Sequence, residues 1–218
     1  MKLLQKLIAG AILLGMVGGS AAWAQDEALY DPAPPPNAAF VRVVNATGET
    51  APISAQIAEV SFKDIAYPAA SPYRIVHEGQ HDASVGNKKE TVTIEAGKYY
   101  TLAAIGSGGA LHLAAISDTI STNPAKCGVL FYNLSDKTSA SLRVPSRKVD
   151  IVGDLGSGQG KMREVNAIDV DLAVVTGDKT VAEFPKVQLK RRTHLSFVLT
   201  GSGDKLQALM VENKTERK

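Results

Sequence analysis

The residues that most suggest chemistry form an H-E-x-x-H pattern at positions 77–81. In zinc proteases this pattern stands on a helix, where both histidines bind the metal and the glutamate acts as a general base. Here Pro72 precedes the pattern, Gly79 lies inside it, and residues 73–76 alternate like a strand. We therefore predict a hairpin turn with no metal site and no catalytic residue. An enzyme that uses His77 and His81 is the least favoured alternative.

Other catalytic patterns are incomplete. No serine stands in a G-x-S-x-G context, and Gly153-Asp154-Leu155 lacks the nucleophile of an esterase motif. The glycine-rich segments 106–109 and 155–160 neither open a helix nor precede Lys-Ser or Lys-Thr, as a phosphate-binding loop requires. We interpret both as turns, and the sequence predicts no bound cofactor.

Several basic residues and a tyrosine are candidates for contact with an acidic partner or a polyanion. A run of three basic residues ends a predicted strand, and Lys and Arg side chains bind carboxylates well. A solvated strand end accounts for the same run. One ring of the Tyr99-Tyr100 pair must face outward from its strand and could stack on a sugar. The candidates are Lys186, Lys190, Arg191, Arg192, Arg143 and Tyr100.

Short strands must position these residues. Runs rich in Val, Ile, Tyr and Phe alternate with Gly, Asn, Asp and Pro, and long amphipathic helical windows are absent. Residues 99–118 align without a gap on residues 194–213, and residues 43–50 align on 131–138. The two offsets differ by one short insertion. The sequence therefore predicts an all-β fold of two tandem, internally repeated β-sandwich-like domains.

The N-terminus reads as an export signal. Lys2 and Lys6 precede an apolar stretch that ends in small residues around Ala22 and Ala24, and glycines interrupt it too early for a membrane span. Cys127 is the only cysteine, so we expect a buried thiol and no lipid attached at Gln25. The predicted divisions are a signal peptide (1–24), a Pro-rich arm (25–37), a first β-domain (38–117), a linker (118–125), a second β-domain (126–213) and a tail (214–218).

Charge argues against a nucleic-acid partner. Removing residues 1–24 takes away two lysines and no acidic residue, which leaves 22 basic and 22 acidic residues. A neutral chain lacks the electrostatic attraction that most nucleic-acid binders carry. We expect an exported protein with no membrane anchor of its own.

Five segments carry a resemblance to a known family. They are ALYDPAPPPNAAFVRVVNA from Ala28, KYYTL from Lys98, NLSDK from Asn133, REVNAIDVDLAVVTGDK from Arg163, and TGSG from Thr200. Together they resemble the AlgF family of periplasmic accessory proteins for alginate O-acetylation. The resemblance implies a periplasmic protein that works beside an acetyltransferase and a membrane acyl-transfer component, and it supplies no catalytic residues.

The leading hypothesis is a non-catalytic adaptor that docks the acetyltransferase, the polymer or both. The main alternative is a polysaccharide-binding module for alginate. An adaptor needs an exposed apolar or charged face, whereas a sugar-binding module needs rings or hydroxyls around a groove.

Overall fold

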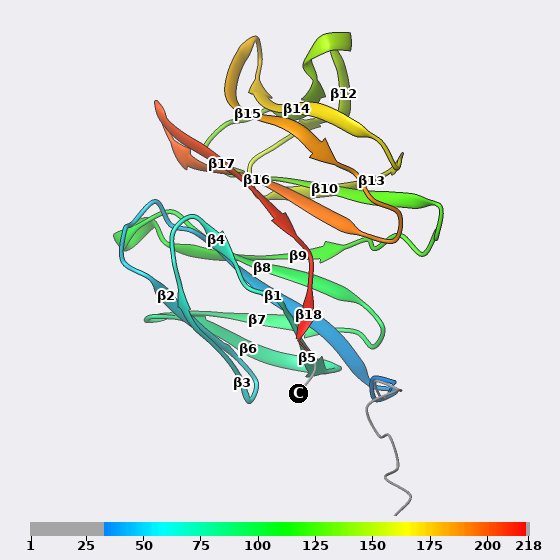
Figure 1. The fold of residues 1–218 in the computed structure, drawn as a ribbon. Coiled ribbons are helices and arrows are strands. Elements are labelled where there is room, and N and C mark those ends of the chain that lie inside the picture. Colours follow the sequence, from blue (N-terminus) through cyan, green and yellow to red (C-terminus); the bar gives the residue numbers. More distant parts are fainter. Residues whose placement is uncertain (1–32, 217–218) are drawn as a thin grey trace, which may run out of the picture. The chain divides into compact units, whose positions relative to one another are not determined.

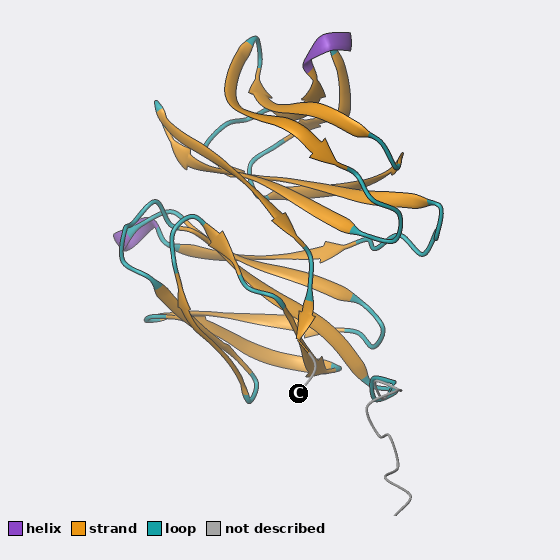
Figure 2. Ribbon diagram, in the orientation of Figure 1, coloured by secondary structure: helices purple, strands orange, loops and turns teal. Residues whose placement is uncertain are grey.

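Strands make up nearly all the regular structure (Figure 2). The computed structural model describes residues 33–216, so the predicted signal peptide and most of the Pro-rich arm lie outside the described residues. Pro34–Lys218 form one compact unit. The helical segments described are two single 3-10 turns, η2 (Gly108–Ala110) and η3 (Pro145–Arg147). No helix in residues 33–216 is long and apolar enough to cross a membrane. The predicted all-β class is confirmed.

The first sandwich pairs an inner sheet of order β18-β5-β1-β8-β9, on which β4 pairs with β1, with an outer sheet of order β3-β2-β6-β7 (Figure 1). Its strands from the first half of the chain are β1 (Ala38–Ala46), β2 (Ile53–Ile57), β3 (Val60–Ile65), β4 (Ala69–Ala70), β5 (Tyr73–His77), β6 (Gly79–Val85), β7 (Lys88–Ile94), β8 (Tyr99–Ile105) and β9 (His112–Asp118).

The second sandwich repeats this plan, with an inner sheet β13-β10-β16-β17 and an outer sheet β12-β11-β14-β15. Its strands are β10 (Lys126–Ser135), β11 (Ala140–Val144), β12 (Val149–Leu155), β13 (Gln159–Asn166), β14 (Asp169–Thr176), β15 (Lys179–Gln188), β16 (His194–Ser202) and β17 (Lys205–Glu212). The last strand, β18 (Thr215–Glu216), leaves this sandwich and pairs in parallel with β5 of the first.

The pairing register confirms the internal repeat. In the first inner sheet β1 runs parallel to β8 with Phe40 opposite Tyr99. In the second inner sheet β10 runs parallel to β16 with Gly128 opposite His194. The repeat matches Gly128 to Phe40 and His194 to Tyr99. The two sandwiches are therefore copies of one topology. The predicted domain boundaries themselves stay predictions.

Matched turns follow the matched strands. Asn45 Oδ1 accepts hydrogen bonds from the backbone N–H and hydroxyl of Thr47, and Asn133 Oδ1 accepts the same pair from Ser135. Each asparagine side chain thus stabilises its own turn. Gly201 has φ +99°, and a Cβ there would lie 2.1 Å from the carbonyl oxygen of Lys205. Only glycine fits such a turn.

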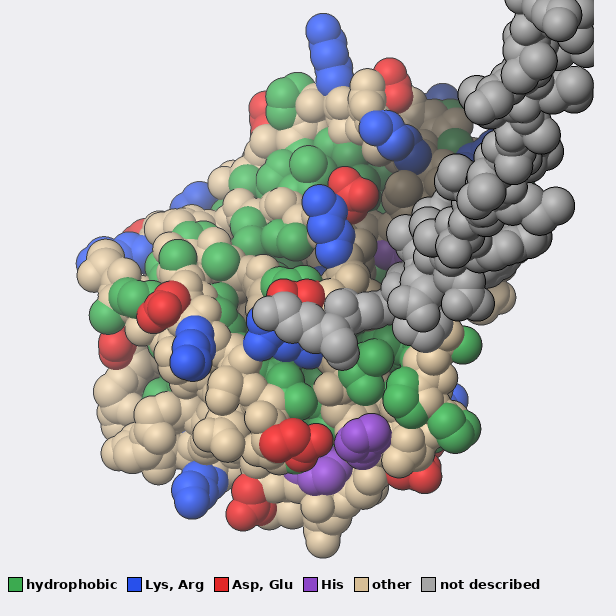
Figure 3. All heavy atoms as spheres, turned by 60° about the horizontal axis from the view of Figure 1, so that its bottom comes forward, with side chains coloured by type: hydrophobic (Ala, Val, Ile, Leu, Met, Phe, Trp, Pro, Cys, Tyr) green, Lys and Arg blue, Asp and Glu red, His purple; other side chains and the backbone are tan. Residues whose placement is uncertain are grey.

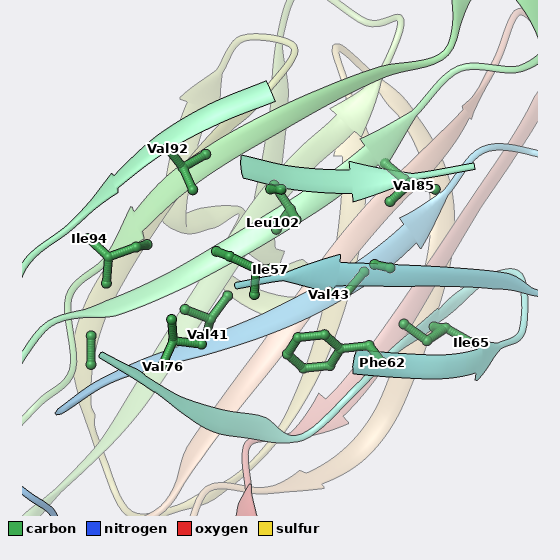
Figure 4. Close-up of a cluster of buried hydrophobic side chains, with 14 residues drawn as sticks. Val41, Val43, Ile57, Phe62, Ile65, Val76, Val85, Val92, Ile94 and Leu102 are labelled. Atoms are coloured by element: carbon green, nitrogen blue, oxygen red, sulfur yellow. The ribbon is translucent and has the colours of Figure 1, made fainter. Parts of the chain in front are cut away.

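Three apolar clusters hold the sheets together. The first fills the first sandwich, with Val41, Phe62 and Leu102 pointing into it (Figure 4). The second fills the second sandwich and contains Phe131 and Phe197. Burying such a side chain stabilises the fold by about 1.5–3 kcal/mol.

The third cluster joins the two inner sheets. It combines Val44 and Ala103 of the first copy with Leu130 and Val198 of the second. Strand β1 is consequently buried at every residue, on both faces. This explains why its sequence is apolar at seven of nine positions instead of alternating between apolar and polar residues.

Candidate functional site

The H-E-x-x-H segment is not helical, but the predicted hairpin is wrong. Strand β5 pairs with β1 in the inner sheet, whereas β6 pairs with β2 and β7 in the outer sheet. The chain therefore changes sheet at Glu78 and Gly79, where Gly79 has φ +137°. Local alternation of side chains shows a strand but not its partner, and for this reason the sequence could not separate a hairpin from a crossing.

The two histidines of this segment have partners within the chain. His81 Nε2 lies 2.8 Å from the carbonyl oxygen of His77, and His77 Nδ1 lies 3.2 Å from Asn37 Oδ1. Figure 3 shows histidine side chains lying together beside acidic side chains, with Lys and Arg side chains scattered over the rest of the view. Among residues 33–216 no group of three His, Cys, Asp or Glu side chains could hold a metal ion.

The predicted basic contacts lie on the second sandwich. Lys186 lies near the end of edge strand β15, and residues 190–192 form the connection to β16. All four side chains are exposed. The backbone N–H of Arg192 donates to the carbonyl oxygen of Lys126, which fixes the turn without using the guanidinium. These four side chains are thus accessible to a binding partner.

Arg143 and Tyr100 are differently placed. Arg143 Nε donates to Asp150 Oδ1 at 2.5 Å, and this hydrogen bond holds the pKa of Asp150 below its ordinary value. The guanidinium is therefore already paired. Tyr100 packs against the first core, and its hydroxyl accepts the N–H of Glu95. Neither residue joins the basic turn of 190–192.

A groove of about 440 Å³ runs between edge strands β15 and β17. Phe184 and Met210 supply its apolar surface, and Lys186 and Lys190 lie along it. The exposed large hydrophobic side chains of the described residues, Val149, Ile168 and Met210, all belong to the second copy. The groove is a mixed apolar and charged surface, with two lysines and two glutamates, of the kind that partners cover.

A buried polar network at the seam of the two inner sheets escaped the sequence analysis. Arg42 is 1% exposed. Its Nε donates to Thr101 Oγ1, and its Nη2 donates to Tyr132 Oη and Ser196 Oγ, each at 2.9 Å. Its Nη1 donates to Asn213 Oδ1 at 2.8 Å. The guanidinium of the first copy is thereby held by three residues of the second half of the chain.

Asp118 completes this network. Its carboxylate accepts hydrogen bonds from Tyr73, Thr101 and Tyr132 at 2.8, 2.5 and 2.6 Å. Burial by itself lowers the pKa of Arg42, but Tyr132, Tyr73 and Asp118 raise it above its ordinary value. Burial, more than any other cause, raises the pKa of both tyrosines. The raised pKa values keep the guanidinium of Arg42 charged and the hydroxyls of both tyrosines protonated near neutral pH.

One feature of the sequence could have indicated this network, namely a charged residue inside an otherwise mostly apolar strand. Arg42 interrupts AAFVRVVNA, and a charge at such a position must find buried partners. Those partners come from β5, β8, β9, β10 and β16 and from Asn213, far apart in the chain, so the sequence could not identify them.

A cleft of about 450 Å³ opens where the parallel strands of both inner sheets end. Its walls are the matched turns after β1, β8, β10 and β16, and Ile105 and Leu134 lie beneath them. The glycine-rich segment 106–109, predicted to be a turn, contributes to one wall of this cleft, and no local pattern in the sequence predicts a site there.

The chain has clear relatives. A family model described as "Alginate O-acetyl transferase AlgF" matches residues 11–195. The alginate biosynthesis protein AlgF of Pseudomonas putida is 33% identical over 94% of this chain and 91% of that protein. The Pseudomonas aeruginosa protein of the same name is 33% identical over 94% and 92%, and the Azotobacter vinelandii protein is 29% identical over 92% and 90%.

Solved structures of two AlgF domains from P. aeruginosa are also similar. The C-terminal domain is 34% identical, covers 41% of this chain and 99% of that domain, and gives a TM-score of 0.38. The N-terminal domain is 24% identical, covers 40% and 100%, and gives a TM-score of 0.33. On the family match and the full-length relatives, this chain belongs to the AlgF family.

Proposed function

We propose that this chain is a non-catalytic periplasmic adaptor for the O-acetylation of mannuronate residues during alginate biosynthesis. Its membership in the AlgF family supports the pathway. The family description includes the word transferase, and the proposal assigns acetyl transfer to a partner acetyltransferase, itself served by a membrane acyl-transfer component. The polymer is the alternative occupant of the docking face.

The places and partners of the groups with displaced pKa values support a non-catalytic role. Within residues 33–216, the groups with displaced pKa values are Arg42, Tyr73, Tyr132, Cys127, Arg143, Asp150 and His194. The first three belong to the buried network, and Arg143 pairs with Asp150. A catalytic centre instead exposes such groups together in a cleft that reaches substrate.

The groove between β15 and β17 is the observation that carries the docking proposal. Protein interfaces combine an apolar centre with a polar rim, and Phe184 and Met210 provide such a centre. Lys186 and Lys190 line the groove, and Arg191 and Arg192 follow in the chain. Glu183 and Glu212 line the same groove, so an acidic protein face with some basic groups fits better than a uniform polyanion.

The test is capture of the purified acetyltransferase and of alginate oligomers, run side by side. Reversing Lys190, Arg191 and Arg192 to glutamate should slow association with the acetyltransferase by about tenfold or more at low salt and weaken its dependence on salt. The matched control reverses three exposed lysines of the first sandwich, Lys63, Lys89 and Lys98, and should leave association unchanged.

Two results would contradict the proposal. Capture of alginate without the acetyltransferase would make the chain a polysaccharide-binding module. An acetyl-protein intermediate, or ester hydrolysis above background with an artificial acetyl donor, would make it an enzyme.

A further inference from the structure

Strand β17 lies at one edge of the second inner sheet, next to β16 (Figure 1). The N–H of Asn213 donates to the carbonyl oxygen of His194. Because hydrogen-bonded pairs alternate along an antiparallel ladder, the odd-numbered residues of β17 bond to β16 and the even-numbered residues turn their backbone groups away from it. Within residues 33–216 no strand pairs with β17 on that outer side. The outward residues are Leu206, Ala208, Met210 and Glu212.

The outer edge of β17 lacks the features that usually protect a free edge from pairing with other strands, namely charges, proline and bulges. Leu206–Val211 contain no charged residue and no proline, and they pair with β16 without a register shift. Edge strand β15, on the other side of the docking groove, has both proline and a bulge. Pro185 has no N–H to donate, and Lys186 has φ +51° where the register with β14 shifts. Of the two edges that border the groove, β17 is therefore the one suited to an added strand.

The groove beside β17 defines which side chains an added strand should carry. Every second side chain of such a strand would point into this groove of about 440 Å³. Phe184 and Met210 supply its apolar part, and Met210 is 44% exposed. Two lysines and two glutamates line the groove, and the exposed Arg191 and Arg192 of the neighbouring turn give the region an excess of positive charge. Apolar side chains flanked by carboxylates fit this surface.

We infer that β17 binds an extended segment of a protein partner as an additional strand of the second inner sheet. Backbone hydrogen bonds to the outward residues of β17 would provide affinity, and alternate side chains in the groove would provide specificity. Apolar side chains would lie over Phe184 and Met210, and carboxylates would face Lys186 and Lys190. The inference rests on the proposed function for the identity of the partner, and it specifies how that partner engages the docking groove.

A second copy of the chain fits this edge less well than a foreign strand. A two-fold axis through an antiparallel pair keeps the faces of the sheet, so even-numbered residues of β17 oppose even-numbered residues. Glu212 would then meet Leu206, Ala208 or Met210 and never Lys205, which leaves its carboxylate without a cation.

The test begins with amide hydrogen exchange of the purified chain, resolved by residue with NMR. In the free chain the odd-numbered amides of residues 207–211 should exchange slowly, and the even-numbered amides of residues 206–212 should exchange at least about tenfold faster. The probe is a capped nine-residue peptide in which threonine alternates with aspartate, valine, valine and aspartate. Binding of this peptide should slow the even-numbered amides to the level of the odd-numbered ones.

Two N-methylated versions of the peptide distinguish strand addition from simple binding in the groove. One version is methylated on the threonine amides, and the other is methylated on the aspartate and valine amides. Only one of these sets can face β17, so one version should lose binding by about tenfold or more and the other should keep it. Equal effects of the two versions would overturn the inference.

Variants of the chain test the same edge. Ala208→Pro removes an outward N–H without removing a bond to β16, and Met210→Lys keeps the backbone but adds a charge to the edge. Each should weaken peptide binding by about tenfold, while its urea midpoint shows whether the fold is retained. The matched control is Ala115→Pro on β9, because the repeat matches Ala115 to Met210. This control should bind the peptide like the parent chain.

Parental binding by Met210→Lys, or no slowing of the even-numbered amides by the peptide, would overturn the inference. Failure of the proposed function gives a different result. If the acetyltransferase is captured but leaves these amides unprotected, strand addition fails and the adaptor proposal stands. If the peptide protects them but the acetyltransferase is not captured, the strand site stands and the proposed partner is wrong.

Discussion

Arg42 Nη2 lies 2.9 Å from Tyr132 Oη, although the two residues belong to different copies of the repeat. The repeat places Leu130 where the first copy has Arg42, so the cation is present once at a seam that is otherwise nearly symmetric. Thr101 and Ser196, which are equivalent in the repeat, both accept hydrogen bonds from this one guanidinium. One buried arginine thus ties the two inner sheets together.

Replacing Arg42 with leucine, the residue of the second copy, should lower the free energy of unfolding by about 3–5 kcal/mol. The substitution removes four buried hydrogen bonds and the positive charge that interacts with the buried carboxylate of Asp118. Urea unfolding measures the change. Arg74→Leu is the control, since its ion pair with Glu216 is partly exposed and contributes at most about 1 kcal/mol. Equal losses in the two variants would contradict the assigned role of Arg42.

The His194 ring makes stability depend on pH. Burial lowers its pKa, and Nε2 has no hydrogen-bond partner within the described residues. The unfolded chain therefore takes up a proton at His194 that the folded chain resists. This contribution is complete above the ordinary pKa of about 6.5 and is lost as the pH falls below it.

We therefore expect the urea midpoint to fall between about pH 8 and about pH 5.5, and His194→Gln to reduce that fall. His112→Gln is the matched control, since its imidazole is exposed on β9. A decline of the same size in His194→Gln would show that other groups cause it.

Cys127 should resist chemical modification in the folded chain. The thiol is 0% exposed, and burial raises its pKa, so little thiolate forms and reagents cannot reach it. Labelling with a thiol reagent should be slow in buffer and fast in denaturing urea. Rapid labelling of the native chain, at the rate of a small free thiol, would mean that β10 opens readily.

Replacing both His77 and His81 with alanine should leave alginate acetylation in cells unchanged. Their ring nitrogens contact Asn37 and the backbone of the same segment, and the described residues offer no third metal ligand nearby. The measurement is the acetyl content of the secreted polymer at equal protein level. A collapse of acetylation would show that this corner of the first sandwich takes part in function.

The repeat made much of the fold predictable. Matched apolar patterns predicted equivalent strands, and the structure pairs those strands with one register in both copies. The sequence could not predict hydrogen-bond partners that lie in different sheets. Arg42 and Asn213, for example, are separated by 171 positions, and no local pattern joins them. The cleft was missed for the same reason, since Ser107 and Ser202 line one cleft only after both sandwiches have formed.

The path of β18 has a consequence for the order in which the chain folds. Thr215 and Glu216 pair with Tyr73 and Arg74, so the first inner sheet receives its edge strand from a segment that follows the second sandwich. The parallel pairs β1–β8 and β10–β16 already join segments about 60 residues apart, and such distant contacts slow folding. Although the first sandwich precedes the second in synthesis, its inner sheet is finished only after Thr215 and Glu216, which follow the second sandwich, have left the ribosome.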